Sequence, residues 1–170
     1  MLPTTVDRID AYFDRTAPEA KARVLAAYPD YSRRRALVAV GSDAMFCAPA
    51  WAFADAYSAH APTYVYRFDH AAWSLRVLGL GATHGSEIVH VQHSYSSYLG
   101  RKLHPLGRRV QPSVGRRMQR TWLNFATGEL GPDWPRYDAQ DRSTRVIRSA
   151  RDDTVADPDA VRRSAWSGLY

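Results

Sequence analysis

The chain has 170 residues, of which 45% are hydrophobic. This length and composition suit one compact domain or a large piece of a bigger one. No stretch is predicted to be long and apolar enough to cross a bilayer, and the N-terminus lacks the basic and apolar segments of a signal peptide. We therefore expect a soluble chain without a membrane span or an export signal of its own.

Cys47 is the only cysteine, which excludes an internal disulfide and a CxxC metal or redox pair. It lies in the apolar run 45–51, where a thiol is more often a small buried hydrophobe than a nucleophile.

The formal net charge is +6, and almost all of the basic residues are arginines. Acidic residues are interspersed with them, and no RRM, KH, zinc-finger or helix-turn-helix signature is present. The pattern favours a solvated surface and no nucleic-acid partner, with a basic, non-enzymatic binding module as an alternative. The basic clusters are Arg33-Arg34-Arg35, Arg108-Arg109, Arg116-Arg117 with Arg120, and Arg162-Arg163.

The first third of the chain is helical in pattern. Thr5 is predicted to cap a helix whose apolar residues recur at helical spacing, and Pro18 suits the first turn of a second helix that ends before Pro29. Ser32 is predicted to cap a third helix, and Gly41 to end it.

A further helix is expected over residues 44–60, another over 112–126, and a terminal helix over 160–168 that Asp157 caps. His84 is expected on a loop, and a helix is predicted to resume beyond Gly85.

Two segments, 63–68 and 143–148, are rich in aromatic or β-branched residues and are predicted to be strands. Trp134-Pro135 is expected in an exposed turn, and residues 151–159 in an ordinary connection. Two short strands do not form a stable sheet alone, so we expect them to belong to a larger sheet. The predicted class is α/β, mostly helical, with about two strands of an incomplete sheet.

The segment Gly79-Leu80-Gly81-Ala82-Thr83-His84-Gly85-Ser86-Glu87-Ile88 places an imidazole between glycines on a turn. A general-base histidine needs such exposure, because one ring nitrogen must face a hydroxyl and the other a carboxylate. The alternative is a local structural role for this histidine. A metal site from His84, His90 and His93 with Glu87 is also considered, but the spacing matches no familiar zinc motif, so none is predicted.

Several segments together resemble the C-terminal part of the type-B carboxylesterase and cholinesterase family of α/β-hydrolases. They cover nearly the whole chain in order. They are Tyr28-Pro29-Asp30-Tyr31, Val40-Gly41-Ser42-Asp43, Tyr64-Val65-Tyr66-Arg67-Phe68, Gly81 to Ile88, Trp122 to Gly128, Trp134-Pro135-Arg136-Tyr137 and Trp166.

The resemblance implies a Ser, Glu or Asp, His triad, with His84 as its catalytic histidine. The Gly-x-Ser-x-Gly elbow, the glycine-rich oxyanion loop and the family's acid motif are absent from this sequence. Asp43 is interpreted as a helix N-cap and Glu87 as an ion-pair or first-turn acid, so neither is assigned as the triad carboxylate.

The resemblance further implies a cofactor-free hydrolase of carboxylic esters, represented here by a single partial domain over residues 1–170 that is inactive alone. A split enzyme, completed by an N-terminal partner chain, is the alternative. In secreted relatives, a cysteine at the Cys47 position can form a disulfide with a cysteine near the final tryptophan. No cysteine lies in the stretch just before Trp166 in this chain, so that disulfide cannot form, which favours a cytoplasmic setting.

Overall fold

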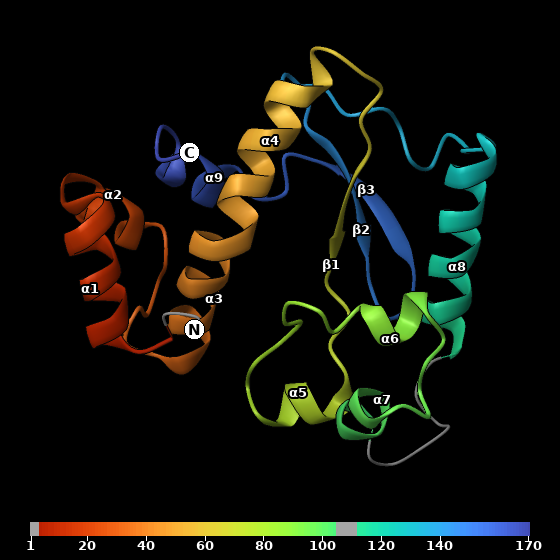
Figure 1. Cartoon of the computed structure of the whole chain (residues 1–170), viewed down its shortest axis with the longest axis horizontal. Coiled ribbons are helices and arrows are strands. Elements are labelled where there is room, and N and C mark those ends of the chain that lie inside the picture. The colour runs from red at the N-terminus through yellow and green to blue at the C-terminus, as the bar shows by residue number, and fades with distance from the viewer. Residues whose placement is uncertain (1–3, 105–111) are drawn as a thin grey trace. The chain divides into compact units, whose positions relative to one another are not determined.

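The computed structural model describes residues 4–104 and 112–170 of the chain. The chain divides into two compact units (Figure 1). One comprises residues 1–63, 138–141 and 157–170, and the other comprises residues 64–137 and 142–156. In the part of the chain that the structure describes, the first unit is helical and the second carries the sheet. The prediction of a single partial domain stays a prediction.

The helical unit is built around one apolar core. Ile9 and Phe13 of the first helix and Val24 of the next are fully buried, and Phe13 stacks on Trp166 near the C-terminus with ring centroids 5.6 Å apart. The core therefore joins the two ends of the chain. The elements are α1 (Val6–Thr16), η1 (Pro18–Ala20), α2 (Lys21–Ala26), α3 (Arg34–Ser42), η2 (Asp43–Cys47), α4 (Ala48–Ser58) and α9 (Ala160–Trp166).

The helices at both ends of this unit start near the predicted positions. Thr5 is the N-cap of α1, although its side chain makes no capping hydrogen bond. Pro18 opens the 3-10 turn that precedes α2. The predicted caps Ser32 and Asp157 are wrong by one and two residues, because the N-caps are Arg33 and Asp159.

The prediction that Gly41 ends a helix is wrong. Gly41 is buried within a helix that runs from Arg34 to Ser58 and contains the π-helical turn η2. Val40, Ala44 and Ala48 pack in the core on one face of this helix. Their burial offsets the roughly 1 kcal/mol by which a helical glycine is less favourable than alanine.

The same helix is 25 residues long, with a mean hydropathy of 1.4 over its most apolar 18 residues, which is enough to cross a membrane by length and composition. The expectation that no stretch reaches this threshold is therefore wrong. Core helices of soluble proteins pass the same test, so passing it is weak evidence for a membrane span. The helix also contributes Val40, Ala44 and Ala48 to the core and carries a buried aspartate.

That aspartate, Asp43, is the centre of a buried polar network. Its carboxylate accepts hydrogen bonds from the Tyr28 hydroxyl at 2.6 Å and from the Arg162 guanidinium at 2.9 Å. Trp166 Nε1 donates to the Tyr28 hydroxyl at 2.6 Å, and Arg162 also pairs with Asp159. The interpretation of Asp43 as an N-cap is wrong, because it lies inside a continuous helix and binds side chains of other elements.

We expect Asp43→Ala to lower the free energy of unfolding by about 3 kcal/mol, because it removes the central acceptor of a buried, hydrogen-bonded ion pair. Urea unfolding monitored by tryptophan fluorescence measures this. The control is Asp30→Asn, which breaks an ion pair with Arg33 and keeps a residue type that tolerates the positive φ of 57° at this position. The side chains of Asp30 and Arg33 are 60% and 75% exposed. An exposed pair contributes at most about 1 kcal/mol. Equal losses in the two variants would contradict the role of the network.

Among its described residues, the sheet-bearing unit has three strands in the order β1-β2-β3. β1 pairs parallel with β2, Val65 opposite Thr144, and β2 pairs antiparallel with β3, Ile147 opposite Asp152. The elements are β1 (Val65–Phe68), α5 (Trp73–Val77), α6 (Ile88–Val91), α7 (Tyr98–Leu103), α8 (Pro112–Thr127), β2 (Ser143–Ile147) and β3 (Asp152–Ala156).

Both predicted strands are confirmed as β1 and β2, whereas β3 corrects the interpretation of residues 151–159 as a connection. Asp152 and Asp153 are unusual in a strand. Here they pair with arginines: Asp152 with Arg117 and Arg145, and Asp153 with Arg148. These pairs compensate the low strand propensity of the two aspartates.

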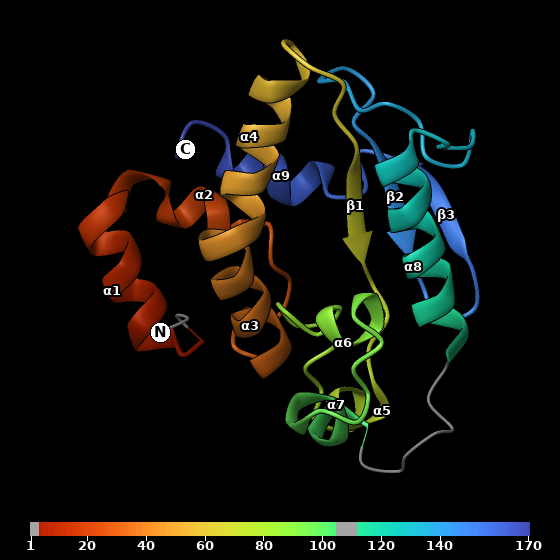
Figure 2. The same cartoon turned by 45° about the vertical axis from the view of Figure 1, so that its right-hand side comes forward.

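α8 packs on one face of the sheet (Figure 2). Val114 and Met118 are fully buried and contact Ile147, Tyr66 and Phe68 of the strands. The predicted helix is confirmed, and its predicted apolar face is buried at its N-terminal half, whereas Phe125 is 53% exposed.

Trp134 corrects the expectation of an exposed turn, because its side chain is 5% exposed. Its indole stacks on Trp122 with ring centroids 5.7 Å apart, and its Nε1 donates to the backbone carbonyl of Val65 at 2.9 Å. This bond ties the segment after α8 to β1.

Candidate active site

His84 lies exposed on a tight turn directly before α6. The backbone adopts positive φ at Gly81 (71°) and Gly85 (78°) on either side of it, a conformation that glycine adopts without strain. The backbone N–H and the hydroxyl of Ser86 donate to the carbonyl of Thr83 at 3.0 and 2.7 Å. The turn therefore has a defined shape and presents the imidazole at the surface, as the sequence predicts.

The short helix α6 anchors this turn in the core. Val89 is fully buried against Leu75 and Leu103 of the neighbouring helices, and Val91 packs against the cluster beneath α8. An exposed imidazole on a fixed support has the placement that a general base needs, since its two nitrogens must meet a hydroxyl and a carboxylate at the same time.

The acidic residues considered in the sequence occupy other places. Glu87 is the N-cap residue of α6. The pKa of Tyr66 is raised first by its own burial and second by the negative charge of Glu87. Asp69 forms a two-point ion pair with Arg67 at 2.8 Å. Asp43 is buried in the helical unit, to which His84 does not belong.

The histidines of the considered metal site differ in environment. His90 is 1% exposed, whereas His84 and His93 are exposed. Within residues 4–104 and 112–170, no group of three or more His, Cys, Asp or Glu side chains is placed to hold a metal ion. The absence of a metal and of a cofactor stays a prediction.

Sequence reasoning missed a row of buried histidines beneath the turn. His90 contacts both His70 and His104, with ring centroids 4.9 and 5.4 Å apart and the rings edge to face. Burial lowers the pKa of His70 to about 4 and that of His90 to about 3. The three residues are far apart in sequence and follow no motif, so only the fold brings them together.

Cys47 belongs to the helical unit. Its side chain is half-buried. This burial first, and the nearby charge of Asp43 second, raise the pKa of the thiol. Because the thiolate is the nucleophilic form, a thiol with a raised pKa suits the predicted structural role.

The arginine clusters are partly neutralised. Arg117 pairs with Asp152 at 3.2 Å, and Arg163 pairs with Asp157 at 2.6 Å. Arg116 and Arg120 are exposed, and Arg108-Arg109 lies outside the described residues.

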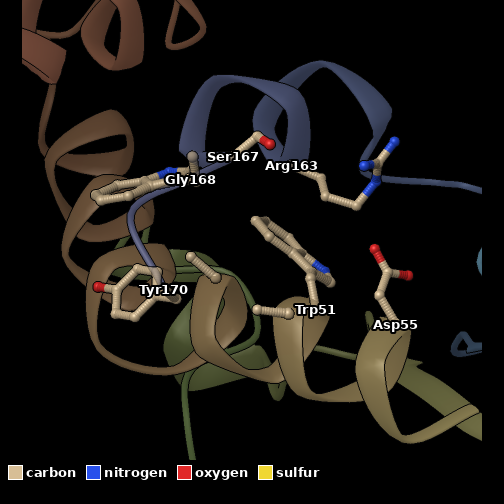
Figure 3. Close-up of a pocket in the computed structure, with 9 residues that line it drawn as sticks. Trp51, Asp55, Arg163, Ser167, Gly168 and Tyr170 are labelled. Carbon is tan, nitrogen blue, oxygen red and sulfur yellow. The ribbon is translucent and has the colours of Figure 1, made fainter.

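A small cavity of about 140 Å³ lies in the helical unit between α4 and α9 (Figure 3). Trp51, Trp166 and Tyr170 line it, and Arg163 and Asp55 extend toward one another at one end. None of the residues proposed for catalysis contributes to this cavity.

Comparison with known proteins identifies the fold. A thermophilic PNB esterase matches 95% of this chain with a TM-score of 0.74 and 22% identity, and another PNB esterase structure matches 94% with a TM-score of 0.75. Each match covers 33% of the solved esterase. The chain therefore forms part of an α/β-hydrolase fold, and the predicted fold class is confirmed, with three described strands where two were expected.

The carboxylesterase family matches residues 10–162, so the chain belongs to the carboxylesterase family. Cocaine esterase from Oryctolagus cuniculus is 37% identical over 109 residues, which are 59% of this chain and 20% of that protein. The chain thus spans about a fifth of this curated relative and about a third of the solved ones.

The support of the turn is tested by Gly100→Ala. A Cβ at Gly100 would overlap the backbone oxygens of Ser94 and Tyr95, so α7 cannot keep its place. We expect a loss of about 2–3 kcal/mol in unfolding free energy by urea denaturation. Gly131→Ala is the control, since no atom lies within 4 Å of a Cβ there, and it is expected to change stability by less than about 1 kcal/mol. A Gly100→Ala protein as stable as the control would refute this packing.

Proposed function

We propose that this chain supplies the catalytic histidine, His84, of a serine hydrolase that cleaves carboxylic esters. The observation that carries the proposal is the exposed imidazole on a fixed turn between positive-φ glycines, in a segment that resembles the family's histidine loop. The family match and the likeness to proteins named for esterase activity support the reaction class.

In the proposed mechanism, His84 removes the proton from a serine hydroxyl as the oxygen attacks the ester carbonyl. The imidazolium then protonates the alcohol as it leaves, which yields an acyl-enzyme. In the second half, His84 removes a proton from water, which attacks the acyl carbonyl. The imidazolium then returns this proton to the serine oxygen as the acyl–oxygen bond breaks, which releases the carboxylic acid and the free serine. The carboxylate that orients the ring and the oxyanion donors belong to motifs that this sequence lacks.

The first consequence concerns the 170-residue chain alone. We expect its hydrolysis of p-nitrophenyl acetate and butyrate to stay at the uncatalysed background, because the nucleophile elbow and oxyanion loop are missing. Turnover that a fluorophosphonate abolishes would contradict this expectation.

The role of His84 is tested in a chimera in which the aligned segment of rabbit cocaine esterase is replaced by this chain. We expect His84→Ala to lower kcat by about 10⁴-fold or more, as removal of a triad residue does. His93→Ala is the matched control, since His93 is exposed in the same unit. Thermal melts establish that each chimera folds. Full activity in a folded His84→Ala chimera would overturn the proposal.

A second possibility, favoured by the sheet, is that another polypeptide supplies the serine and the acid. Within the described strands, β1 pairs with β2 on one side only, and its residues are half-buried. An edge of this kind can accept a further strand. Activity regained on mixing this chain with a separate polypeptide that carries Gly-x-Ser-x-Gly would support this arrangement, and failure of every such mixture would count against it.

The remaining expectations are proposals as well. A carboxylic ester as the substrate, no cofactor, no nucleic-acid partner and a cytoplasmic setting follow from the resemblance and the composition. A basic binding module remains the non-enzymatic alternative. It predicts salt-sensitive retention on DNA that is lost when Arg116 and Arg117 are replaced by alanine.

A further inference from the structure

The row His70, His90 and His104 lies where the segment that carries His84 meets the rest of its unit. His70 follows the end of β1, His90 lies on α6, and His104 is the C-cap of α7. Each is at most 5% exposed. The row therefore connects β1 to both helices that follow the His84 turn.

The polar contacts of these rings suit neutral imidazoles. His70 Nδ1 bonds with the Ser149 hydroxyl at 2.8 Å, and His90 Nδ1 with the Tyr95 hydroxyl at 3.0 Å. Nε2 of His70 and both ring nitrogens of His104 are buried without a hydrogen-bond partner among the described residues. A hydroxyl can donate or accept a hydrogen bond but carries no charge, so none of these contacts compensates the charge of an imidazolium.

The surrounding charges also oppose protonation. The carboxylates on the packed elements are Asp69, which pairs with Arg67, and Glu87, whose charge raises the pKa of Tyr66. Asp152 and Asp153 of β3 pair with Arg117 and Arg148 and so neutralise part of the positive charge. The cations on these elements are Arg76, Arg101, Lys102, Arg116, Arg117 and Arg148, and His93 lies at the end of α6. Burial is the largest cause of the lowered pKa of His70, and the charges of His104, Arg117 and Arg76 add to it. For His90, burial is again the largest cause, and the charges of His70 and His104 add to it.

We propose that the buried row His70, His90 and His104 is an acid-triggered latch. While the three imidazole rings are neutral, the row holds residues 83–104 against the sheet. When the rings are protonated, this segment, which includes the His84 turn, is released. Its consequence for catalysis rests on the proposed role of His84, whereas the release itself is measurable without any activity.

The direction follows from linkage. The folded pKa values of His70 and His90, about 4 and about 3, lie below the ordinary value of 6.5. The released segment therefore binds more protons than the folded one between these values, and the folded form loses stability as the pH falls below 6.5. Several neighbouring rings take up protons together, so the loss is steep in pH.

The experiment is hydrogen exchange of the 170-residue chain from pH 8 to pH 3.5, read by mass spectrometry and corrected for the intrinsic rate. We expect peptides within residues 83–104 to lose protection between about pH 6 and pH 4, above the pH at which α1 loses it. His90→Phe, which keeps an aromatic ring but cannot be protonated, is expected to lower this midpoint by about half a pH unit or more. The control is His60→Phe at an exposed ring outside this segment, which should leave the midpoint unchanged.

A second measurement on the unaltered chain does not depend on a variant. In imidazole NMR spectra, the rings of His70, His90 and His104 are expected to titrate together at the exchange midpoint. Rings that titrate singly near pH 6.5 while residues 83–104 stay protected would overturn the proposal. An equal midpoint in His90→Phe and His60→Phe would also overturn it. So would a segment that is unprotected even at pH 8, because neutral rings would then not hold it.

Discussion

The parallel pairing of β1 with β2 is the constraint on which the rest of the sheet-bearing unit depends. Two parallel strands cannot be joined by a hairpin, so the chain must cross over between them. In this protein the crossover spans residues 69–142 and contains the His84 turn, the buried histidine row and α8. The turn thus follows the carboxyl end of β1, the end at which sites of open α/β sheets are found.

The short helices of this crossover contribute little stability by themselves, because helices of four to six residues are too short to persist without packing. Their positions come from a few buried side chains, Val89 and Leu103 among them, and from close approach at Gly100. The imidazole row fills the space between these contacts and β1. A buried imidazole becomes unfavourable in free energy when it is protonated, so the packing that supports the His84 turn is sensitive to pH.

The sequence predicts well the features that local chemistry determines. β1 and β2 are confirmed because aromatic or β-branched residues are frequent in them, and α8 because its apolar residues recur at helical spacing. The His84 loop is confirmed because glycines flank it. Features that depend on distant partners were missed or misread: β3, whose aspartates need Arg117 and Arg148, the burial of Trp134 against Val65, and the continuation of the helix through Gly41. No local pattern records these partners. The histidine row belongs to the same group.

The buried titratable groups of the two units respond to acid in opposite directions, because one is a carboxyl group and the others are imidazoles. In the helical unit, burial raises the pKa of Asp43 above the ordinary carboxyl value, so protonation of this group on acidification favours the folded form over the unfolded one. In the sheet-bearing unit, burial lowers the pKa of His70 and His90, so acidification favours the unfolded form. A fall in pH therefore loosens the segment that carries His84. Protonation of Asp43 does not destabilise the helical core around it.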